Sequence, residues 1–234
     1  MQAVILAGGM ATRLGELSKS LPKSLMDVNG IPFLFHQINM LKHRGVTEFI
    51  LCTGHLGEMI EEYAGNGDEF GVKIRYSRDG STLRGTGGAI KNALPLVNDQ
   101  FFVINGDTYL PIDLNQMDSA FSASEKLGIM AVFKNQNRWD TSNVIMNGNL
   151  VEQYVKDGGV PNMHFIDAGI VMFKKSVFVE YPFSDLFPLE DVYVKLIQSK
   201  EMAGFETDQR FFEIGSKAGL QEIRDLAHSG VLPN

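Results

Sequence analysis

Uninterrupted apolar runs alternate with helical patterns through the first half of the chain. Short apolar runs are typical of strands buried on both faces, whereas apolar residues three and four positions apart indicate helices. The predicted strands are 3–6, 49–52, 72–76 and 101–104, the third by its alternating pattern. The predicted helices are 32–45, 59–63 and 87–94. Strand and helix alternate in this way in a parallel sheet covered on both faces, which predicts an α/β fold with a Rossmann-like, doubly wound and mostly parallel sheet.

The pattern changes at about Gly128, where strand-like segments follow one another without full helices between them. These segments are 129–132, 143–146, 150–154 and 165–173. Helical patterns return at 189–199 and 217–228, with strand-like residues at 205 and 211–214 between them. We therefore expect a mixed-sheet insert in the second half. No linker, repeat or shift in composition divides the chain, so we expect a single domain over 1–234, with halves of about 1–127 and 128–234.

Composition narrows the class of protein. The 234 residues are 44% hydrophobic and 21% charged, which is ordinary for a globular protein, and the net charge of -7 argues against a nucleic-acid surface. Cys52 is the only cysteine, so an intramolecular disulfide is excluded. The apolar run 3–7 is too short for a signal peptide, and nothing approaches the roughly 20 apolar residues that span a bilayer. We expect a cytoplasmic protein with no nucleic-acid or membrane partner.

A glycine loop follows the first predicted strand. The loop and its flanks contain Leu6, Ala7, Gly8, Gly9, Thr12, Arg13 and, after Pro22, Lys23. Adjacent glycines let backbone N–H groups approach an anion, while a guanidinium and an ammonium supply positive charge to phosphate oxygens. The glycine spacing matches neither a dinucleotide fingerprint nor a P-loop. The pattern therefore predicts a phosphate-binding loop of another kind.

Asp107 comes directly after the buried strand 101–104, in the run Asn105, Gly106, Asp107. An unpaired carboxylate is costly to bury, so this side chain is expected at the mouth of the strand, facing a cation. Mg²⁺ prefers one or two carboxylates together with substrate phosphates and water. The other interpretation is a turn aspartate without a ligand.

The motif G-G-x-x-T-R-L followed by P-K resembles the signature of the sugar-phosphate nucleotidyltransferases, and the resemblance extends over nearly the whole chain. It implies that an NTP and a sugar 1-phosphate react, with Mg²⁺, to give an NDP-sugar and pyrophosphate. It also implies that Arg13, Lys23 and Asp107 are catalytic. The chain is most similar to short, single-domain enzymes of the heptose 1-phosphate guanylyltransferase type, which act in capsule, lipopolysaccharide or other surface-glycan precursor synthesis.

The same resemblance assigns roles to further residues of the nucleotide-binding half, 1–127. It also assigns a metal-binding role to a carboxylate in the second half of the chain. Gly85 belongs to a glycine cluster that would close over the base of the nucleotide. The alternative is a purely structural role, because glycines are common at the start of helices. Arg84 is either a ligand contact or a solvated side chain. Asp107 takes the place of a metal ligand. The second metal carboxylate is usually an aspartate, and here Glu213 stands in its place, one methylene longer, with Asp208 as the alternative.

The sugar-phosphate half, 128–234, resembles the family in two strands. Lys156 is the lysine available for the sugar phosphate, without the glutamate that usually precedes it, and Asp167 replaces an asparagine. A carboxylate only accepts hydrogen bonds, whereas an amide also donates, so we expect a sugar hydroxyl pattern unlike that of the glucose or thymidylyl enzymes. Asn143 and Glu190 are further candidates for sugar contacts. The alternatives are a solvated Lys156 and a Glu190 that only begins a helix.

Two other functions are compatible with the motifs. The same site could activate a non-sugar phosphate, or the protein could be a catalytically silent sensor of nucleotide sugars. A silent sensor predicts the loss of Arg13, Lys23 or Asp107, and all three are present.

Overall fold

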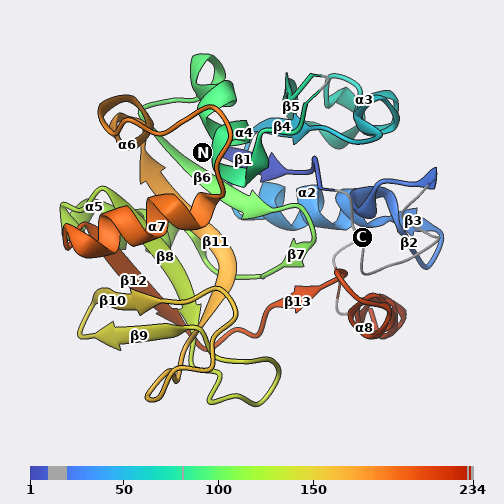
Figure 1. Ribbon diagram of the computed structural model, residues 1–234. Helices are drawn as coiled ribbons and strands as arrows, with labels where there is room; N and C mark the ends of the chain where they lie inside the picture. Colours follow the sequence, from blue (N-terminus) through green and yellow to red (C-terminus); the bar gives the residue numbers. More distant parts are fainter. Residues whose placement is uncertain (10–19, 81, 231, 233–234) are drawn as a thin grey trace.

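A nine-stranded sheet forms the centre of the molecule in the computed structural model, which describes residues 1–9, 20–80, 82–230 and 232 (Figure 1). The strand order is β5-β4-β1-β6-β11-β8-β12-β10-β9. The strands are β1 (Gln2–Leu6), β4 (Glu48–Thr53), β5 (Lys73–Arg78), β6 (Gln100–Asn105), β8 (Gly128–Phe133), β9 (Val144–Asn147), β10 (Leu150–Tyr154), β11 (Ile166–Lys174) and β12 (Met202–Thr207).

Strand direction separates the two halves of the sheet. The strands β5, β4, β1 and β6 are mutually parallel. Strand β11 is antiparallel to both β6 and β8. Strand β12 is parallel to β8, and β10 is antiparallel to both β12 and β9. The first half is therefore a parallel nucleus and the second a mixed extension, which confirms the predicted fold class.

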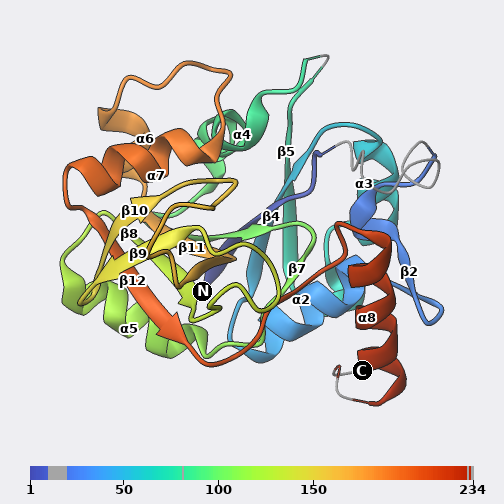
Figure 2. The ribbon, with the colours of Figure 1, turned by 60° about the horizontal axis from the view of Figure 1, so that its bottom comes forward.

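Both faces of the sheet are covered by helices. Figure 2 shows α4, α6 and α7 on one side of the sheet and α2 and α5 on the other. The helices are α2 (Phe33–His43), α3 (Gly57–Ala64), α4 (Gly85–Ala93), α5 (Leu114–Ser124), α6 (Ser176–Glu180), α7 (Leu189–Gln198) and α8 (Lys217–His228). The 3₁₀ turns in the described ranges are η2 (Lys23–Leu25), η3 (Asp68–Phe70) and η4 (Leu94–Leu96).

The alternation of side chains along β1 explains the two layers. Ala3 and Ile5 enter the core that contains α2, α3 and α5, whereas Val4 enters the core that contains α4 and α7. All three are fully buried. A strand with apolar residues on both faces is stable only between two helical layers, so this run places β1 in the middle of the sheet.

Two short strand pairs lie outside the main sheet: β2 (Asp27–Val28) with β3 (Ile31–Pro32), and β7 (Thr108–Tyr109) with β13 (Phe212–Glu213). In the second pair Glu213 lies opposite Thr108, and the Ile214 N–H donates to the Asp107 carbonyl over 3.0 Å. This ladder carries the C-terminal part of the chain back to the turn that follows β6.

Helix α5 was absent from our sequence prediction. Its signals were present: the Asp113 side chain accepts the N–H groups of Asn115 and Gln116 at 2.9 and 3.2 Å, and buried residues recur at Leu114, Met117 and Phe121. The other predicted elements agree with the structure to within a few residues at their ends. No helix in the described ranges is long and apolar enough to cross a membrane.

The start of α8 provides a test of how the C-terminal segment is held. The Ser216 Oγ accepts the Gly219 N–H at 3.1 Å, and this cap follows directly on β13. Ser216→Ala should lower the free energy of unfolding by about 1 kcal/mol, because a helix N–H loses its acceptor. Ser216→Asn keeps an acceptor and should stay near the wild type in urea denaturation. Equal losses in the two variants would show that the cap does not stabilise α8.

Candidate active site

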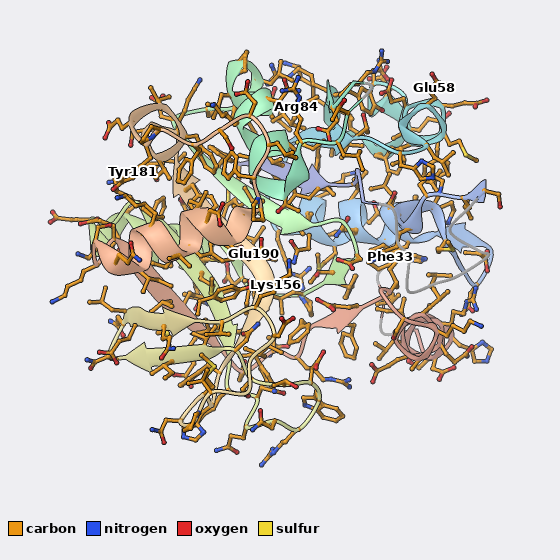
Figure 3. The ribbon with its side chains drawn as sticks, in the orientation of Figure 1. Phe33, Glu58, Arg84, Lys156, Tyr181 and Glu190 are labelled. Atoms are coloured by element: carbon orange, nitrogen blue, oxygen red, sulfur yellow. The ribbon has the colours of Figure 1, made fainter. Side chains whose placement is uncertain are left out.

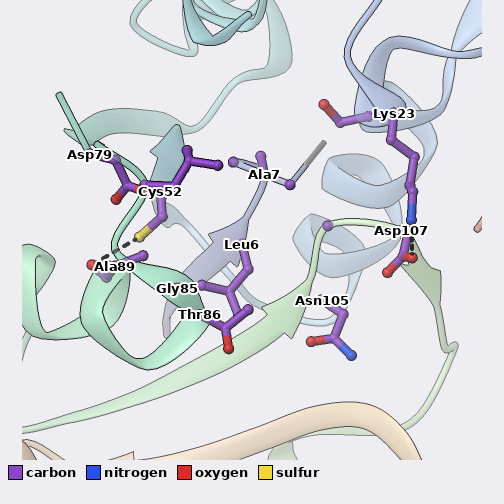
Figure 4. Close-up of a pocket in the computed structure, with 15 residues that line it drawn as sticks. Leu6, Ala7, Lys23, Cys52, Asp79, Gly85, Thr86, Ala89, Asn105 and Asp107 are labelled. Carbon is purple, nitrogen blue, oxygen red and sulfur yellow. Dashed lines mark hydrogen bonds and ion pairs between the residues drawn. The ribbon is translucent and has the colours of Figure 1, made fainter. Parts of the chain in front are cut away.

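A cavity opens at the carboxyl ends of the parallel strands (Figure 4). Its volume is about 260 Å³. Its lining comes from the ends of β1, β4 and β6, the segment after β5, and the start of α4. The lining residues are Leu6, Ala7, Gly8, Gly9, Lys23, Ser24, Cys52, Asp79, Leu83, Gly85, Thr86, Ala89, Asn105, Gly106 and Asp107. Ligands of open α/β sheets bind at this edge, because the loops after parallel strands meet there.

The predicted glycine loop contributes Leu6, Ala7, Gly8 and Gly9 to this cavity. Thr12 and Arg13, which complete the predicted loop, lie outside the described residues. Lys23 enters from the start of η2 and reaches the cavity on the side opposite Asp79 and Cys52 (Figure 4).

Lys23 and Asp107 form an ion pair at one end of the cavity. The Lys23 Nζ lies 2.7 Å from the Asp107 Oδ2, and both side chains are about four-fifths buried. The buried Gln37 amide donates to the carbonyls of Asn105 and Thr108 at 2.9 and 2.7 Å, which holds the turn that carries Asp107. The geometry therefore presents one cation and one anion, 84 positions apart in sequence, at a fixed place.

The β7–β13 ladder brings Glu213 to the same turn. Glu213 is the cross-strand neighbour of Thr108, which directly follows Asp107. Asp208 lines a separate hollow with Pro111 and Gln116. No group of three or more His, Cys, Asp or Glu side chains gathers as a metal cluster in the described part of the chain. Asp107 and Glu213 come from neighbouring segments, and Mg²⁺ takes one or two carboxylates and completes its shell with phosphate and water.

The four residues predicted to contact the sugar phosphate also lie together. The Asp167 N–H donates to the Asn143 Oδ1 over 2.9 Å. Lys156, on the segment after β10, forms an ion pair with Glu190 in the first turn of α7, as Figure 3 shows. The acidic partner of Lys156 therefore comes from another element of the fold.

Asp167 is the member of this cluster whose carboxyl pKa is raised. Burial raises the pKa of its carboxyl to about 6, and the negative charge of Glu190 adds to the increase, while the Gly169 N–H, which donates to the Asp167 Oδ1 at 2.9 Å, opposes it. Burial also raises the pKa values of Tyr154 and Tyr193, whose rings pack edge to face beside this cluster at 5.1 Å. Burial disfavours the charged form of each of these groups and is the main cause of all three shifts.

The two clusters adjoin through a close contact between backbone and side chain. Gly169 on β11 has a φ of +82°, and a Cβ at this position would lie 2.6 Å from the Thr108 Oγ1. Only glycine allows β11 to approach β7 this closely. Asp167 and Asp107 are each two or fewer residues from this contact, so the segments that carry them are neighbours, although Asp167 does not line the cavity.

The glycine cluster at the start of α4 packs against the segment before α7. The sequence alone did not decide between this structural role and ligand binding. The N–H groups of Gly87 and Gly88 donate to the Phe187 carbonyl at 3.0 and 3.2 Å, and the Leu189 N–H donates to the Thr86 Oγ1 at 2.8 Å. A Cβ on Gly87 would lie 2.3 Å from the Phe187 ring. These glycines fasten α4 to the segment before α7, whereas Gly85 lines the cavity.

Sequence reasoning missed Asp79 as a site residue. It lines the cavity and is 8% exposed, and its Oδ2 accepts the Arg84 N–H at 3.1 Å. The signal was an acidic residue three positions after a predicted strand, at the edge where ligands bind. Arg84 does not line this cavity, and its Nε is buried without a hydrogen-bond partner among the described residues.

Comparison with known proteins identifies relatives of similar length. Residues 2–200 match the family model described as nucleotidyl transferase. The chain is 33% identical over 219 residues to a D-glycero-alpha-D-manno-heptose 1-phosphate guanylyltransferase of Campylobacter jejuni, which covers 92% of this chain and 95% of the relative. A protein of the same name from Aneurinibacillus thermoaerophilus is 34% identical over 220 residues, covering 92% and 93%.

Solved structures agree with these matches. The crystal structure of HddC from Yersinia pseudotuberculosis superposes with a TM-score of 0.82 at 26% identity, covering 96% of this chain and 98% of that one. The complex of HddC with GMP-PN superposes with a TM-score of 0.80 over the same shares of both chains.

The raised pKa of Asp167 predicts a stability change with pH. The folded pKa of about 6 lies above the roughly 3.9 of an unfolded aspartate, so the wild type loses stability as the pH rises between these values. Asp167→Asn cannot ionise and keeps an oxygen for the Gly169 N–H. The variant should become more stable than the wild type as the pH rises, by on the order of 2 kcal/mol above pH 6.

Urea denaturation between about pH 4.5 and 8 measures this difference. The matched control is Asp157→Asn, which changes an exposed acid on the segment that also carries Lys156. A gap between Asp167→Asn and the wild type that stays constant with pH would contradict the assignment.

Proposed function

This chain belongs to the nucleotidyl transferase family and is a sugar-1-phosphate nucleotidyltransferase, and we propose that it transfers a guanylyl group from GTP to a heptose 1-phosphate. The family predicted from the sequence is thereby confirmed. The proposal of guanine and heptose is supported by relatives that share a third of their residues with this chain over nearly their whole length. A hexose 1-phosphate is the second candidate acceptor. The product would be a precursor for a surface glycan such as capsule or lipopolysaccharide.

The observation that carries the proposal is that two charged clusters lie on segments that meet at the Gly169–Thr108 contact. One cluster holds Lys23 and Asp107, and the other holds Lys156 with Asp167 and Glu190. A reaction between two phosphorylated substrates requires two anion sites side by side. Holding both substrates in line is the main contribution that a protein makes to phosphoryl transfer of this kind.

The reaction requires no base from the protein. An oxygen of the sugar 1-phosphate, already ionised at neutral pH, attacks the α-phosphorus of the NTP; the new P–O bond forms as the bond to the β-phosphate breaks, and pyrophosphate leaves with its electron pair. In this proposal Lys23 contacts the α-phosphate, and Arg13 contacts the departing pyrophosphate. The loop Leu6, Ala7, Gly8 and Gly9 holds the nucleotide with Thr12 and Gly85. Positive groups fixed before the reaction stabilise the charge that develops at the transition state.

Asp107 and Glu213 would hold Mg²⁺; this proposal is supported by the pairing of Glu213 with Thr108, the residue after Asp107, and by the carboxylate oxygens that both side chains offer. A bound Mg²⁺ supplies positive charge to the phosphate oxygens. Asp107 is paired with Lys23, and this ion pair holds both side chains at one end of the cavity.

The sugar phosphate would bind to the second cluster, with Lys156 at the phosphate. Asn143, Asp167 and Glu190 would then read the sugar hydroxyls, since their oxygens accept hydrogen bonds from O–H donors. The Glu190 Oε2 is buried and has no hydrogen-bond partner in the described ranges, which suits an acceptor waiting for a hydroxyl.

Two alternatives predict different behaviour. A non-sugar phosphate substrate predicts a pocket in which Lys156 and Asp167 do not face the phosphate. A silent nucleotide-sugar sensor would bind nucleotide without turnover. We also propose a cytoplasmic location, where the buried thiol of Cys52 would remain reduced.

A pyrophosphate-release assay tests the proposed reaction. Wild-type protein with Mg²⁺ is screened with the common NTPs against a panel of hexose and heptose 1-phosphates. Turnover with GTP and a heptose 1-phosphate is expected to exceed that of all other pairs. Turnover with phosphoalcohols alone would favour the first alternative, and nucleotide binding without any turnover would favour the second.

Removing either member of the Lys23–Asp107 pair should abolish most turnover. Lys23→Met and Asp107→Asn should each lower kcat by about 10²- to 10³-fold, because each removes charge at the reacting phosphate. The control Lys73→Met removes an exposed lysine from β5, whose partner is Glu48. Normal turnover in Lys23→Met or Asp107→Asn would exclude the assigned roles.

Replacing Lys156 should weaken the binding of the sugar phosphate and not that of the NTP. Lys156→Met is expected to raise KM for the sugar phosphate by about 10- to 100-fold, because a hydrogen bond to a charged phosphate is lost, and to leave KM for the NTP unchanged. Lys195→Met, on the same helix as Glu190 but over the Tyr181 ring, is the control. Equal changes in both KM values would indicate a structural effect instead.

A further inference from the structure

Strand β13, which carries Glu213, is only two residues long and lies between the mixed half of the sheet and α8 (Figure 1). On its C-terminal side the Ile214 N–H donates to the Asp107 carbonyl at 3.0 Å. On its N-terminal side Arg210, three positions before Glu213, contacts three separate elements. Neither the sequence motifs nor the proposed reaction gives Arg210 a role.

The Arg210 guanidinium is held by a carboxylate and by two aromatic rings. Its Nη1 and Nη2 donate to the two carboxylate oxygens of Glu222 on α8, at 2.7 and 2.9 Å. Its Cζ lies 3.6 Å from the centre of the Trp139 ring and 4.7 Å from the centre of the Phe212 ring. A planar guanidinium suits both kinds of contact, because it pairs with a carboxylate through two parallel N–H groups and stacks on aromatic faces. We call these four side chains the arginine clasp.

Trp139 brings the sugar-phosphate half of the chain into this clasp. It lies in the loop between β8 and β9 and is 56% exposed, but the loop beneath it is well anchored. The Trp139 N–H donates to the Asn135 Oδ1 at 3.2 Å, and the Asn135 Nδ2 donates to the Asp140 carbonyl and the Ser142 Oγ at 2.6 and 3.1 Å. Asn135 and Ser142 are fully buried. The clasp therefore ties β13 and α8 to a fixed loop of the other half.

The clasp acts on Glu213 through Phe212. These two residues are consecutive in β13, so their side chains point to opposite sides of the strand. Holding the Phe212 ring on one side fixes the rotation of the strand, and with it the direction in which the Glu213 side chain leaves the backbone. A glutamate needs this support more than an aspartate, because one more rotatable bond separates its carboxylate from the backbone.

We propose that Arg210 is a positioning residue for the metal site: through the clasp it holds β13 in the orientation that directs the Glu213 carboxylate to Mg²⁺. This inference rests on the metal-binding role proposed above for Glu213. Groups that orient a metal ligand contribute to metal affinity without touching the metal. Arg210 is then required for the contribution of the metal, and not for the contacts that the protein itself makes to the nucleotide.

Nucleotide binding with and without metal tests this role in the absence of any reaction. Calorimetric titration measures the Kd of GTP in EDTA and again in Mg²⁺, with no sugar phosphate present. The ratio of the first Kd to the second gives the contribution of the metal, and the part of it that arises in solution is the same for every variant. Arg210→Met should reduce this ratio about 10-fold relative to the wild type, because a group that orients a metal ligand is removed. The Kd in EDTA should stay at the wild-type value.

Two further variants separate the parts of the clasp. Arg210→Lys keeps a cation for the aromatic rings but cannot hold both Glu222 oxygens, so its ratio should lie between those of Arg210→Met and the wild type. Trp139→Ala removes one aromatic contact from an exposed position and leaves the Arg210–Glu222 pair, so it should reduce the ratio about 2- to 5-fold. Trp139→Ala therefore tests the proposal even if Arg210→Met fails to fold.

Arg75→Met is the matched control. The side chains of Arg75 and Arg210 have similar exposure, 32% and 27%, and Arg75 also pairs with a glutamate, Glu48, at 2.7 Å. Glu48 begins β4, at the end of the strand remote from the cavity. Arg75→Met should lower thermal stability and leave the ratio unchanged. Trp139 is the only tryptophan, so its emission reports the clasp and should shift to longer wavelength in Arg210→Met, where one ring face is uncovered, but not in Arg75→Met.

A ratio that is unchanged in both Arg210→Met and Trp139→Ala would overturn the assignment of Arg210 while leaving the proposed reaction intact. Equal weakening of GTP binding in Mg²⁺ and in EDTA would overturn it as well, because it indicates a structural role alone. So would wild-type protein whose GTP binding does not respond to Mg²⁺. If the ratio falls as expected but the wild type turns over no sugar phosphate, the role of Arg210 stands and the proposed function fails.

Discussion

Burial of β1 on both faces is the constraint on which the rest of the structure depends. Ala3, Val4 and Ile5 are fully buried, and β1 pairs in parallel with β4 on one side and β6 on the other. Parallel pairing brings the carboxyl ends of the three strands to one edge. The glycine loop, Cys52 and the turn of Asp107 therefore meet at one cavity because the central strand leaves no other arrangement.

The second half of the chain is attached to this edge at two places. Strand β11 approaches β7 through Gly169, and α7 is joined to α4 through the Phe187 carbonyl and the glycine N–H groups. Glu190 lies in the first turn of α7, three residues after Phe187, so the proposed sugar acid is positioned by the same contacts that pack the nucleotide side. Neither substrate region is an independent module.

Charge is arranged in the same way in both clusters. Each lysine assigned to a phosphate is paired with an acid from a distant part of the sequence: Lys23 with Asp107, and Lys156 with Glu190. Each pair holds its lysine in place and neutralises the charge of the acid. A substrate phosphate can then bind the lysine together with the acid, or displace the acid from it. The lysines differ in exposure, since Lys156 is two-thirds exposed and Lys23 about one-fifth, which suits a phosphate at the rim and another inside the cavity.

The sequence by itself determined the layered α/β fold, the family and the local motifs, because apolar periodicity and the glycine-rich loop depend only on neighbouring residues. Helix α5 was equally local, with its Asp113 cap and buried stripe, and was overlooked. Only the tertiary structure decided that Glu213 lies beside the Asp107 turn, that Glu190 is the partner of Lys156, and that the Asp79 carboxylate enters the cavity with one unpaired oxygen. Each of these contacts joins residues from separate elements. Sequence spacing does not specify such contacts, because they form only when the nine strands and their helices pack together.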